Sequence, residues 1–191
     1  MTLPAPKPLP TLELTPRARL AAVAERFDAP RFRSLTLRHL RRWGIAYAAA
    51  MAAAAWFHSH YALGLNASRS LPGNLYLIER GTLPQRGEHV AFRWAGGGAY
   101  PAGVTFIKLL AGQGGDTVAR EGSVFSVAGT PIGPAKPLSR RGEPLEPGPT
   151  GTLPEGRYFV FAPHPDSLDS RYALTGWIAR EQIIGRARAI F

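Results

Sequence analysis

The sequence contains no cysteine, which excludes a disulfide framework, a thiolate metal site and a cysteine nucleophile. Acidic residues are also scarce, because 13 Asp and Glu face 23 Lys and Arg and leave a formal net charge of +10. The excess is concentrated in residues 1–43, which carry nine basic and three acidic residues. Basic residues just before an apolar segment are typical of a protein that enters a membrane with its basic side in the cytoplasm. Basic residues that bind nucleic acid would instead be expected throughout the folded domain. We therefore expect no nucleic-acid partner.

Long helical periods are missing after residue 65, where short apolar runs are separated by Gly and Pro. This pattern is typical of strands joined by turns, so we predict that residues 66–191 form a mainly β domain. Residues 140–156, rich in Pro, Gly and Glu, are expected to form an excursion from its sheet. The predicted strands are residues 75–79, 89–94, 104–110, 117–120, 123–127, 158–162 and 183–190.

Residues 1–42 are predicted to form a basic, proline-rich cytoplasmic tail. The prolines near its start prevent a regular helix there, while residues 17–27 fit a short helix. Residues 31–42 interleave basic and apolar side chains, as either a segment facing anionic lipid or a solvated linker does. The sequence assigns no function to this tail.

Residues 43–65 are predicted to form a single transmembrane anchor. Residues 43–57 contain no charged residue, and the whole segment has roughly the 20 residues that a bilayer span needs. Aromatic residues lie toward both of its ends, as they do at membrane interfaces. Because alanine is only weakly apolar, a cleaved signal peptide and a soluble helix remain alternatives. With the basic tail inside, a single pass through the inner (cytoplasmic) membrane places residues 66–191 on the periplasmic side.

Two serines precede a turn at the start of the predicted β domain. Leu71, just after Ser70, is biased toward extended conformations by the proline that follows it, and the Pro-Gly-Asn of residues 72–74 is a turn signal. Ser70 is therefore expected between a loop and a strand. There its backbone N–H could bind an oxyanion, with the Ser68 hydroxyl as a second donor. The same residues are also typical of an ordinary turn.

A lysine, Lys108, interrupts an apolar predicted strand. Strand alternation places it on the same face as Val104, Phe106 and Leu110. Desolvation of the ammonium would lower the lysine pKa from about 10.4 to about 7 or 8. A neutral Lys108 could then accept the Ser70 proton as a general base. The alternative is a lysine whose charged end reaches solvent.

A third polar cluster lies near the C-terminal end. Ser167, Asp169 and Arg171 alternate along an extended segment, so their side chains share one side of it. A hydroxyl and a carboxylate there could hold Lys108 in position, or Asp169 and Arg171 could form an ion pair that stiffens the site. A Ser-His-Asp triad that uses His164 is the competing arrangement, and Lys108 is the favoured base.

Together these three segments resemble the S26 signal peptidases, which are membrane-anchored Ser-Lys proteases. Residues 68–72, Ser-Arg-Ser-Leu-Pro, resemble the nucleophile box of that family. Residues 108–116, from the lysine to the aspartate, resemble its lysine box, and residues 167–171, Ser-Leu-Asp-Ser-Arg, resemble its final box. The Asn-x-Ser-x-Ser-Leu-Pro-x-x-Leu-Tyr pattern of residues 66–76 resembles the conjugative-transfer, TraF-type branch. The Phe-Ala-Pro of residues 161–163, where the family usually has Gly-Asp-Asn, fits that branch.

The resemblance implies that Ser70 is the nucleophile and Lys108 its general base, with no cofactor and no metal ion. It also implies supporting roles for four further residues, which would bind the oxyanion, orient the lysine or stiffen the site. These residues are Ser68, Ser167, Asp169 and Arg171. The fold it implies is a signal-peptidase-like β domain with a single N-terminal transmembrane helix.

The expected function is that of a membrane-anchored serine endopeptidase that processes an exported precursor at the membrane surface. On the branch resemblance, the substrate is the pilin of a conjugative transfer system, which is cleaved or cyclised. The partners are then a precursor protein and the lipid bilayer. Three alternatives remain: a general signal peptidase I, a self-cleaving Ser-Lys repressor with a soluble DNA-binding domain, and a catalytically silent docking component of a secretion or conjugation assembly.

Overall fold

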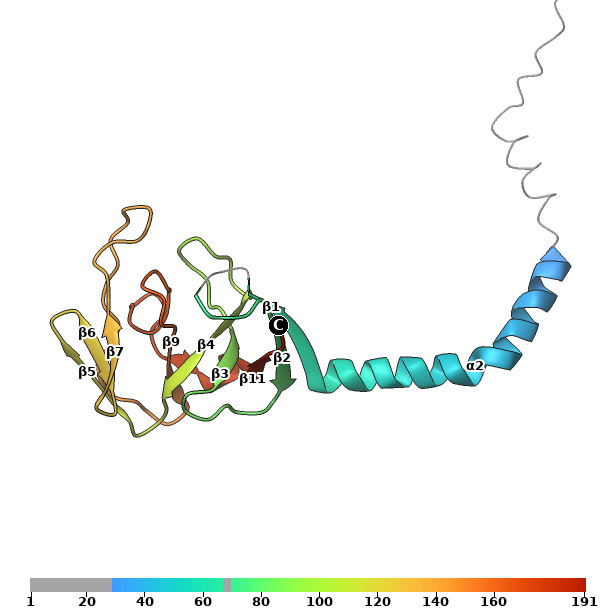
Figure 1. Ribbon diagram of the computed structural model, residues 1–191, viewed down its shortest axis with the longest axis horizontal. Coiled ribbons are helices and arrows are strands. Elements are labelled where there is room, and N and C mark those ends of the chain that lie inside the picture. Colours follow the sequence, from blue (N-terminus) through green and yellow to red (C-terminus); the bar gives the residue numbers. More distant parts are fainter. Residues whose placement is uncertain (1–28, 67–69) are drawn as a thin grey trace, which may run out of the picture. The chain divides into compact units, whose positions relative to one another are not determined.

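Figure 1 shows the computed structural model of the protein, which describes residues 29–66 and 70–191. The chain divides into two compact units, residues 1–53 and residues 54–191. The short helix predicted at residues 17–27 and the predicted oxyanion donor Ser68 lie outside the described residues. The second unit carries the described strands, and its fold positions the candidate site.

The N-terminal element of the described chain is a helix, α2 (Ala29–His60). Pro30 lies in its first turn, where the missing N–H of proline leaves no helical hydrogen bond unmade. The helix therefore begins before residue 43, and the basic residues 31–42, expected in the tail, belong to it.

The predicted anchor at residues 43–65 is not one continuous helix. α2 ends at His60, and β1 (Tyr61–Leu65) follows directly as a strand that pairs antiparallel with β2 (Leu75–Arg80). A short apolar run is compatible with either helix or strand, and pairing with β2 decides between them here. Within the described residues, no helix has the combined length and hydropathy of a membrane span.

The larger sheet in the described chain is antiparallel and has seven strands, in the order β1-β2-β11-β3-β4-β9-β10 (Figure 1). The C-terminal strand β11 (Ile183–Ala189) lies between β2 and β3 and pairs with both. The C-terminus accordingly lies beside β1 and β2. The other strands of this sheet are β3 (His89–Arg93), β4 (Thr105–Gly112), β9 (Arg157–Phe161) and β10 (Ile178–Ala179).

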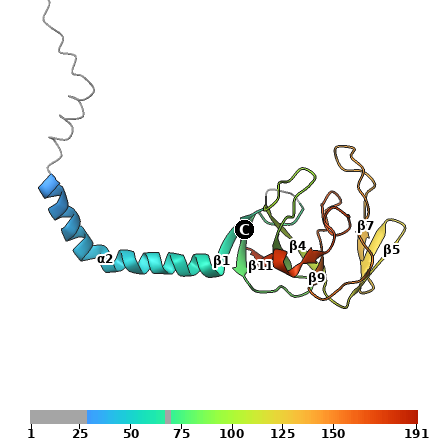
Figure 2. The same cartoon turned by 180° about the vertical axis from the view of Figure 1, so that it is seen from behind.

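The smaller sheet has four described strands, in the order β7-β6-β5-β8. Figure 2 shows β5 and β7 at the end of this unit, beyond β4 and β9. Phe125, Phe159 and Tyr172 meet in one buried cluster, so the two sheets share an apolar interior. The strands of the smaller sheet are β5 (Thr117–Glu121), β6 (Val124–Val127), β7 (Thr130–Pro134) and β8 (Gly151–Thr152).

The predicted mainly β domain is confirmed, and each predicted strand overlaps an observed one. The strands that were not predicted are β1, β7, β8 and β10. β7 contains Pro131 and Pro134, which cannot donate to a ladder, and it is tolerated because it lies at the edge of its sheet. β8 and β10 have two residues each, which is too short for any period to appear.

The excursion predicted at residues 140–156 contributes β8 and also folds back over the third polar cluster. Gly148 donates its backbone N–H to the Arg171 carbonyl at 2.7 Å. A side chain at this position has no room, because a Cβ on Gly148 would lie 2.3 Å from the Ser170 carbonyl oxygen. Glycine is therefore required for the close packing that holds this cluster in place.

Candidate active site

Lys108 is buried in the middle of the larger sheet. It lies in β4, opposite Val90 of β3, and only 5% of its surface is exposed. The ring centroid of Phe106, on the same face, lies 5.8 Å from the Lys108 Nζ. The burial expected from strand alternation is observed for Lys108 and Leu110, whereas Val104 precedes the strand and is exposed.

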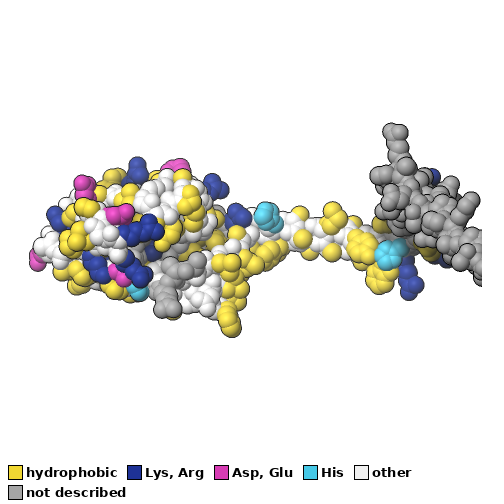
Figure 3. All heavy atoms as spheres, turned by 90° about the horizontal axis from the view of Figure 1, so that it is seen from above, with side chains coloured by type: hydrophobic (Ala, Val, Ile, Leu, Met, Phe, Trp, Pro, Cys, Tyr) yellow, Lys and Arg dark blue, Asp and Glu magenta, His cyan; other side chains and the backbone are white. Residues whose placement is uncertain are grey.

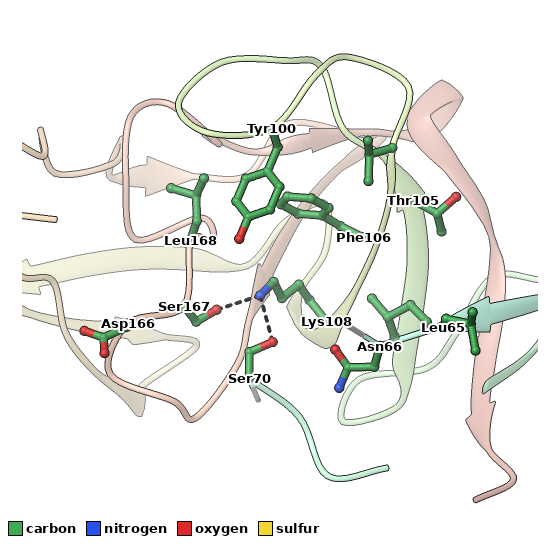
Figure 4. Close-up of a pocket in the computed structure, with 12 residues that line it drawn as sticks. Leu65, Asn66, Ser70, Tyr100, Thr105, Phe106, Lys108, Asp166, Ser167 and Leu168 are labelled. Carbon is green, nitrogen blue, oxygen red and sulfur yellow. Dashed lines mark hydrogen bonds between the residues drawn. The ribbon is translucent and has the colours of Figure 1, made fainter. Parts of the chain in front are cut away.

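Two serine hydroxyls from distant segments meet the amine of Lys108 (Figure 4). Its Nζ lies 3.4 Å from the Ser70 Oγ and 2.7 Å from the Ser167 Oγ. A neutral amine can donate one N–H to Ser167 and present its lone pair to the Ser70 proton. This is the geometry of a serine nucleophile with a lysine general base.

Burial lowers the pKa of Lys108 from an ordinary value of 10.5 to about 8, because loss of water penalises the ammonium form. The negative charge of Asp169 raises this pKa and the positive charge of Arg171 lowers it, so these two smaller effects oppose each other. A lowering of this size corresponds to roughly 3 kcal/mol of differential interaction between the two protonation states. About one Lys108 in ten is then neutral at pH 7 and able to act as a base.

Asp169 and Arg171 form a buried, bidentate ion pair. The Arg171 Nε and Nη2 donate to the two Asp169 carboxylate oxygens at 2.9 and 2.8 Å. Arg171 also donates to the carbonyls of Pro134 and Ala162, so the pair joins the ends of β7 and β9. Within the described residues, no carboxylate forms an ion pair with Lys108. Asp169 therefore forms its ion pair with Arg171 rather than with Lys108.

The turn that follows Ser70 is held by three hydrogen bonds to consecutive carbonyls. The Asn66 side-chain amide donates to the Leu71 and Gly73 carbonyls at 3.1 and 3.0 Å, and the buried Tyr76 hydroxyl donates to the Pro72 carbonyl. Gly73 has a φ of +90°, a conformation that side chains disfavour. Asn66 and Tyr76 stood in the sequence pattern without a role, because only the folded turn places their polar atoms against it.

His164, the histidine of the competing triad, is engaged in its own loop. Its ring Nδ1 accepts the Asp166 backbone N–H at 3.1 Å, and its carbonyl accepts the Ser167 backbone N–H at 3.1 Å. These bonds shape the loop that carries Ser167. The structure instead places the basic group of Lys108 beside Ser70.

A cavity of about 170 Å³ opens beside the Ser70–Lys108 dyad, and both residues form part of its wall. In Figure 4, Tyr100, Phe106 and Leu168 lie on one side of the lysine and Asn66 lies on the other. A space of this size accommodates one side chain of modest size. Its apolar lining consists of Leu65, Tyr100, Val104, Phe106, Ile107 and Leu168.

Residues 36–191 match the protein family described as "Signal peptidase, peptidase S26". The chain therefore belongs to the S26 signal peptidase family and is a serine peptidase of the signal peptidase type. A search of curated proteins finds no match. Among solved structures, the chain is similar to a signal peptidase I from Enterococcus faecalis V583, at 25% sequence identity over 55% of this chain and 97% of that chain, with a TM-score of 0.38.

The lowered pKa of Lys108 predicts how reaction at Ser70 depends on pH. Only neutral Lys108 can accept the proton, so acylation of Ser70 by a small serine-directed probe should rise about tenfold per pH unit below 8 and level off above it. Labelling should vanish in Lys108→Ala, while His164→Ala should keep the inflection near pH 8. A flat profile, or an inflection that moves with His164, would contradict a lysine base.

The buried ion pair predicts a large loss of stability in Asp169→Ala. This change leaves the Arg171 charge buried without its partner, which should lower the free energy of unfolding by about 3 to 5 kcal/mol in denaturant titrations. Arg86→Ala, which breaks the more exposed pair with Asp116, is the matched control and should cost about 1 kcal/mol or less. Equal costs for the two variants would argue against a structural role for the buried pair.

Proposed function

We propose that Ser70 and Lys108 carry the peptidase activity of this chain. Neutral Lys108 accepts the Ser70 proton while the Ser70 Oγ attacks a peptide carbonyl, and the resulting oxyanion is bound by the Ser70 backbone N–H and the Ser68 hydroxyl. The amine then leaves with the proton from Lys108, and an acyl-enzyme remains. The observation that carries this proposal is the buried Nζ of Lys108, 3.4 Å from the Ser70 Oγ.

The substrate in this proposal is an exported precursor protein with small residues near its cut. Support comes from the cavity beside Ser70, which is largely apolar and has a volume of about 170 Å³. A side chain next to the scissile bond has to fit this space, and a large aromatic or charged side chain would fit poorly.

We further propose that the precursor is the pilin of a conjugative transfer system. The support is the TraF-type pattern of residues 66–76, in which Asn66 and Tyr76 hold the turn after the nucleophile. In this branch the acyl-enzyme is resolved either by water, which releases a trimmed pilin, or by an amine of the substrate, which yields a cyclised one. The second candidate is a general signal peptidase I, which the family description favours.

We also propose that the α2 segment anchors the protein in the inner membrane by a single pass, with the β domain, which begins at β1 (Tyr61–Leu65), on the periplasmic side. Residues 43–57 carry no charge, and basic residues precede them. Figure 3 shows hydrophobic side chains along α2. Several large hydrophobic side chains of α2 are exposed, among them Trp43, Ile45, Tyr47, Met51 and Trp56. The lipid bilayer is then the second partner of this chain, besides the precursor.

The test of the peptidase proposal is processing in cells that make the protein with either a pilin precursor or a general preprotein. Ser70→Ala should lower processing by roughly a thousandfold or more, because it removes the proposed nucleophile. Ser59→Ala, which removes an exposed serine outside the site, is the control. Mass spectrometry of the products separates trimmed from cyclised chains.

The outcomes of this experiment distinguish the candidates. Processing of the pilin precursor alone supports the conjugative branch, and processing of the preprotein supports a general signal peptidase I. A folded Ser70→Ala protein that still processes either substrate would refute the assignment of the nucleophile. If the wild type processes neither and takes up no probe at Ser70, a docking component is the better reading.

The anchor predicts that the wild-type protein stays with membranes after alkaline extraction. Ala50→Lys should shift it toward the extract, because a lysine near the centre of a span costs about 3 kcal/mol. Ala119→Lys places the same charge on an exposed position of β5 and is the matched control. Extraction of the wild type as readily as Ala50→Lys would overturn the anchor.

A further inference from the structure

A second cavity adjoins the one beside the dyad. It is larger, at about 710 Å³ against about 170 Å³, and four residues line both cavities. These shared residues are Tyr100, Asp166, Ser167 and Leu168. Because the hydroxyl of Ser167 contacts the Lys108 amine, the shared wall lies directly beside the dyad. The second cavity therefore lies next to the place where a polypeptide substrate would cross Ser70.

The walls of the second cavity are tied to one another by the protein itself. Lys136 donates its backbone N–H to the Tyr172 hydroxyl at 3.1 Å, which joins the segment after β7 to the third polar cluster. Leu174 packs so closely on the turn before Tyr100 that a Cβ on Gly97 would lie 2.8 Å from it. The cavity is thus a built feature of the fold.

The surface of this cavity is partly apolar and partly basic. Leu138, Leu174 and Tyr100 line it, and each is exposed by 45% or more. They offer contact area to an occupant. An extended peptide advances about 3.3 Å per residue, so a cavity of this volume accommodates several residues of such a chain.

The charges that line the cavity are three cations and two carboxylates. Lys136 pairs with Asp166 at 2.5 Å, and the Glu143 carboxylate accepts a hydrogen bond from Ser139. Arg140 and Arg141 form no ion pair within the described part of the chain. The hydrogen bond from Lys136 is the largest cause of the lowered pKa of Asp166, and the Arg140 charge contributes a smaller lowering. Neither guanidinium group is bound directly by a carboxylate of the described chain, and guanidinium binds carboxylates well.

We propose that the second cavity is a further substrate subsite, in which Arg140 and Arg141 select an acidic side chain of the precursor a few residues from its scissile bond. The inference rests on the proposed dyad of Ser70 and Lys108. A peptide fits better than an anionic membrane surface, because the site is concave and adjoins the cavity at the nucleophile.

The test uses a cleavable peptide that is neutral around its cut, and variants that carry a single Glu at each position on either side in turn. Wild-type enzyme in neutral detergent should prefer Glu over Gln at one position or at neighbouring positions, by roughly threefold to tenfold in kcat/KM. Arg140→Gln/Arg141→Gln should reduce this ratio to about one. Arg120→Gln/Arg157→Gln, which changes arginines that line neither cavity, is the matched control and should keep the preference.

Reversing the charge of the two arginines is a second, independent test of the subsite. Arg140→Glu/Arg141→Glu should prefer Lys over Glu at the same position. Labelling of Ser70 by the small probe checks in each variant that the dyad is intact, so failure of the dyad is distinguishable from failure of the subsite. With labelling intact, a wild type without a Glu preference, or a preference that survives in Arg140→Gln/Arg141→Gln, overturns the proposal. An effect of these arginines that requires anionic vesicles overturns it in favour of lipid binding.

Discussion

Burial of an ammonium group shifts its equilibrium toward the neutral amine, and a carboxylate that faces the group shifts it back. Burial is the larger effect at Lys108, where the nearby Asp169 carboxylate is held bidentately by Arg171. Burial has the largest effect and lowers the pKa of Lys108 to about 8. The Asp169 charge raises this pKa and the Arg171 charge lowers it, so the two charges oppose each other. Had Asp169 faced Lys108 directly, the ion pair would have kept the lysine protonated and unable to take a proton from Ser70. The partition of charge between neighbouring groups is therefore what would allow Lys108 to act as the proposed base.

The fold provides this arrangement by bringing together three segments that are remote in sequence. Ser70 and Ser167 lie 38 and 59 residues from Lys108, yet both contact its amine. β4 supplies the rigid strand for the lysine, while the Ser70 turn is held by Asn66 and Tyr76. Because Arg171 reaches the ends of β7 and β9, the ion pair that binds the Asp169 carboxylate also joins the two sheets around the lysine. Stability and chemistry thus depend on the same buried contacts.

Much of the domain could be predicted from local pattern, and the exceptions have physical causes. Strands with clear apolar runs, such as β3 and β4, were predicted near their observed bounds because a short apolar run bounded by turn residues is typical of a buried strand. β1 was assigned to the preceding apolar segment, since nothing in five residues distinguishes the end of a helix from a strand that pairs with β2. β7 was hidden by its two prolines, which an edge strand tolerates and a central strand would not.

The sequence by itself indicated the class of enzyme, because residues 68–72, 108–116 and 167–171 together resemble the boxes of the S26 signal peptidases, and the family match agrees. It also indicated the mainly β character of the domain through its short apolar runs separated by Gly and Pro. Only the tertiary structure decided that Asp169 binds Arg171 and not Lys108, that Ser167 contacts the amine, and that a second basic cavity shares a wall with the first. The reason is that electrostatic effects depend on distance and burial, and these are set by contacts between segments that no local pattern contains.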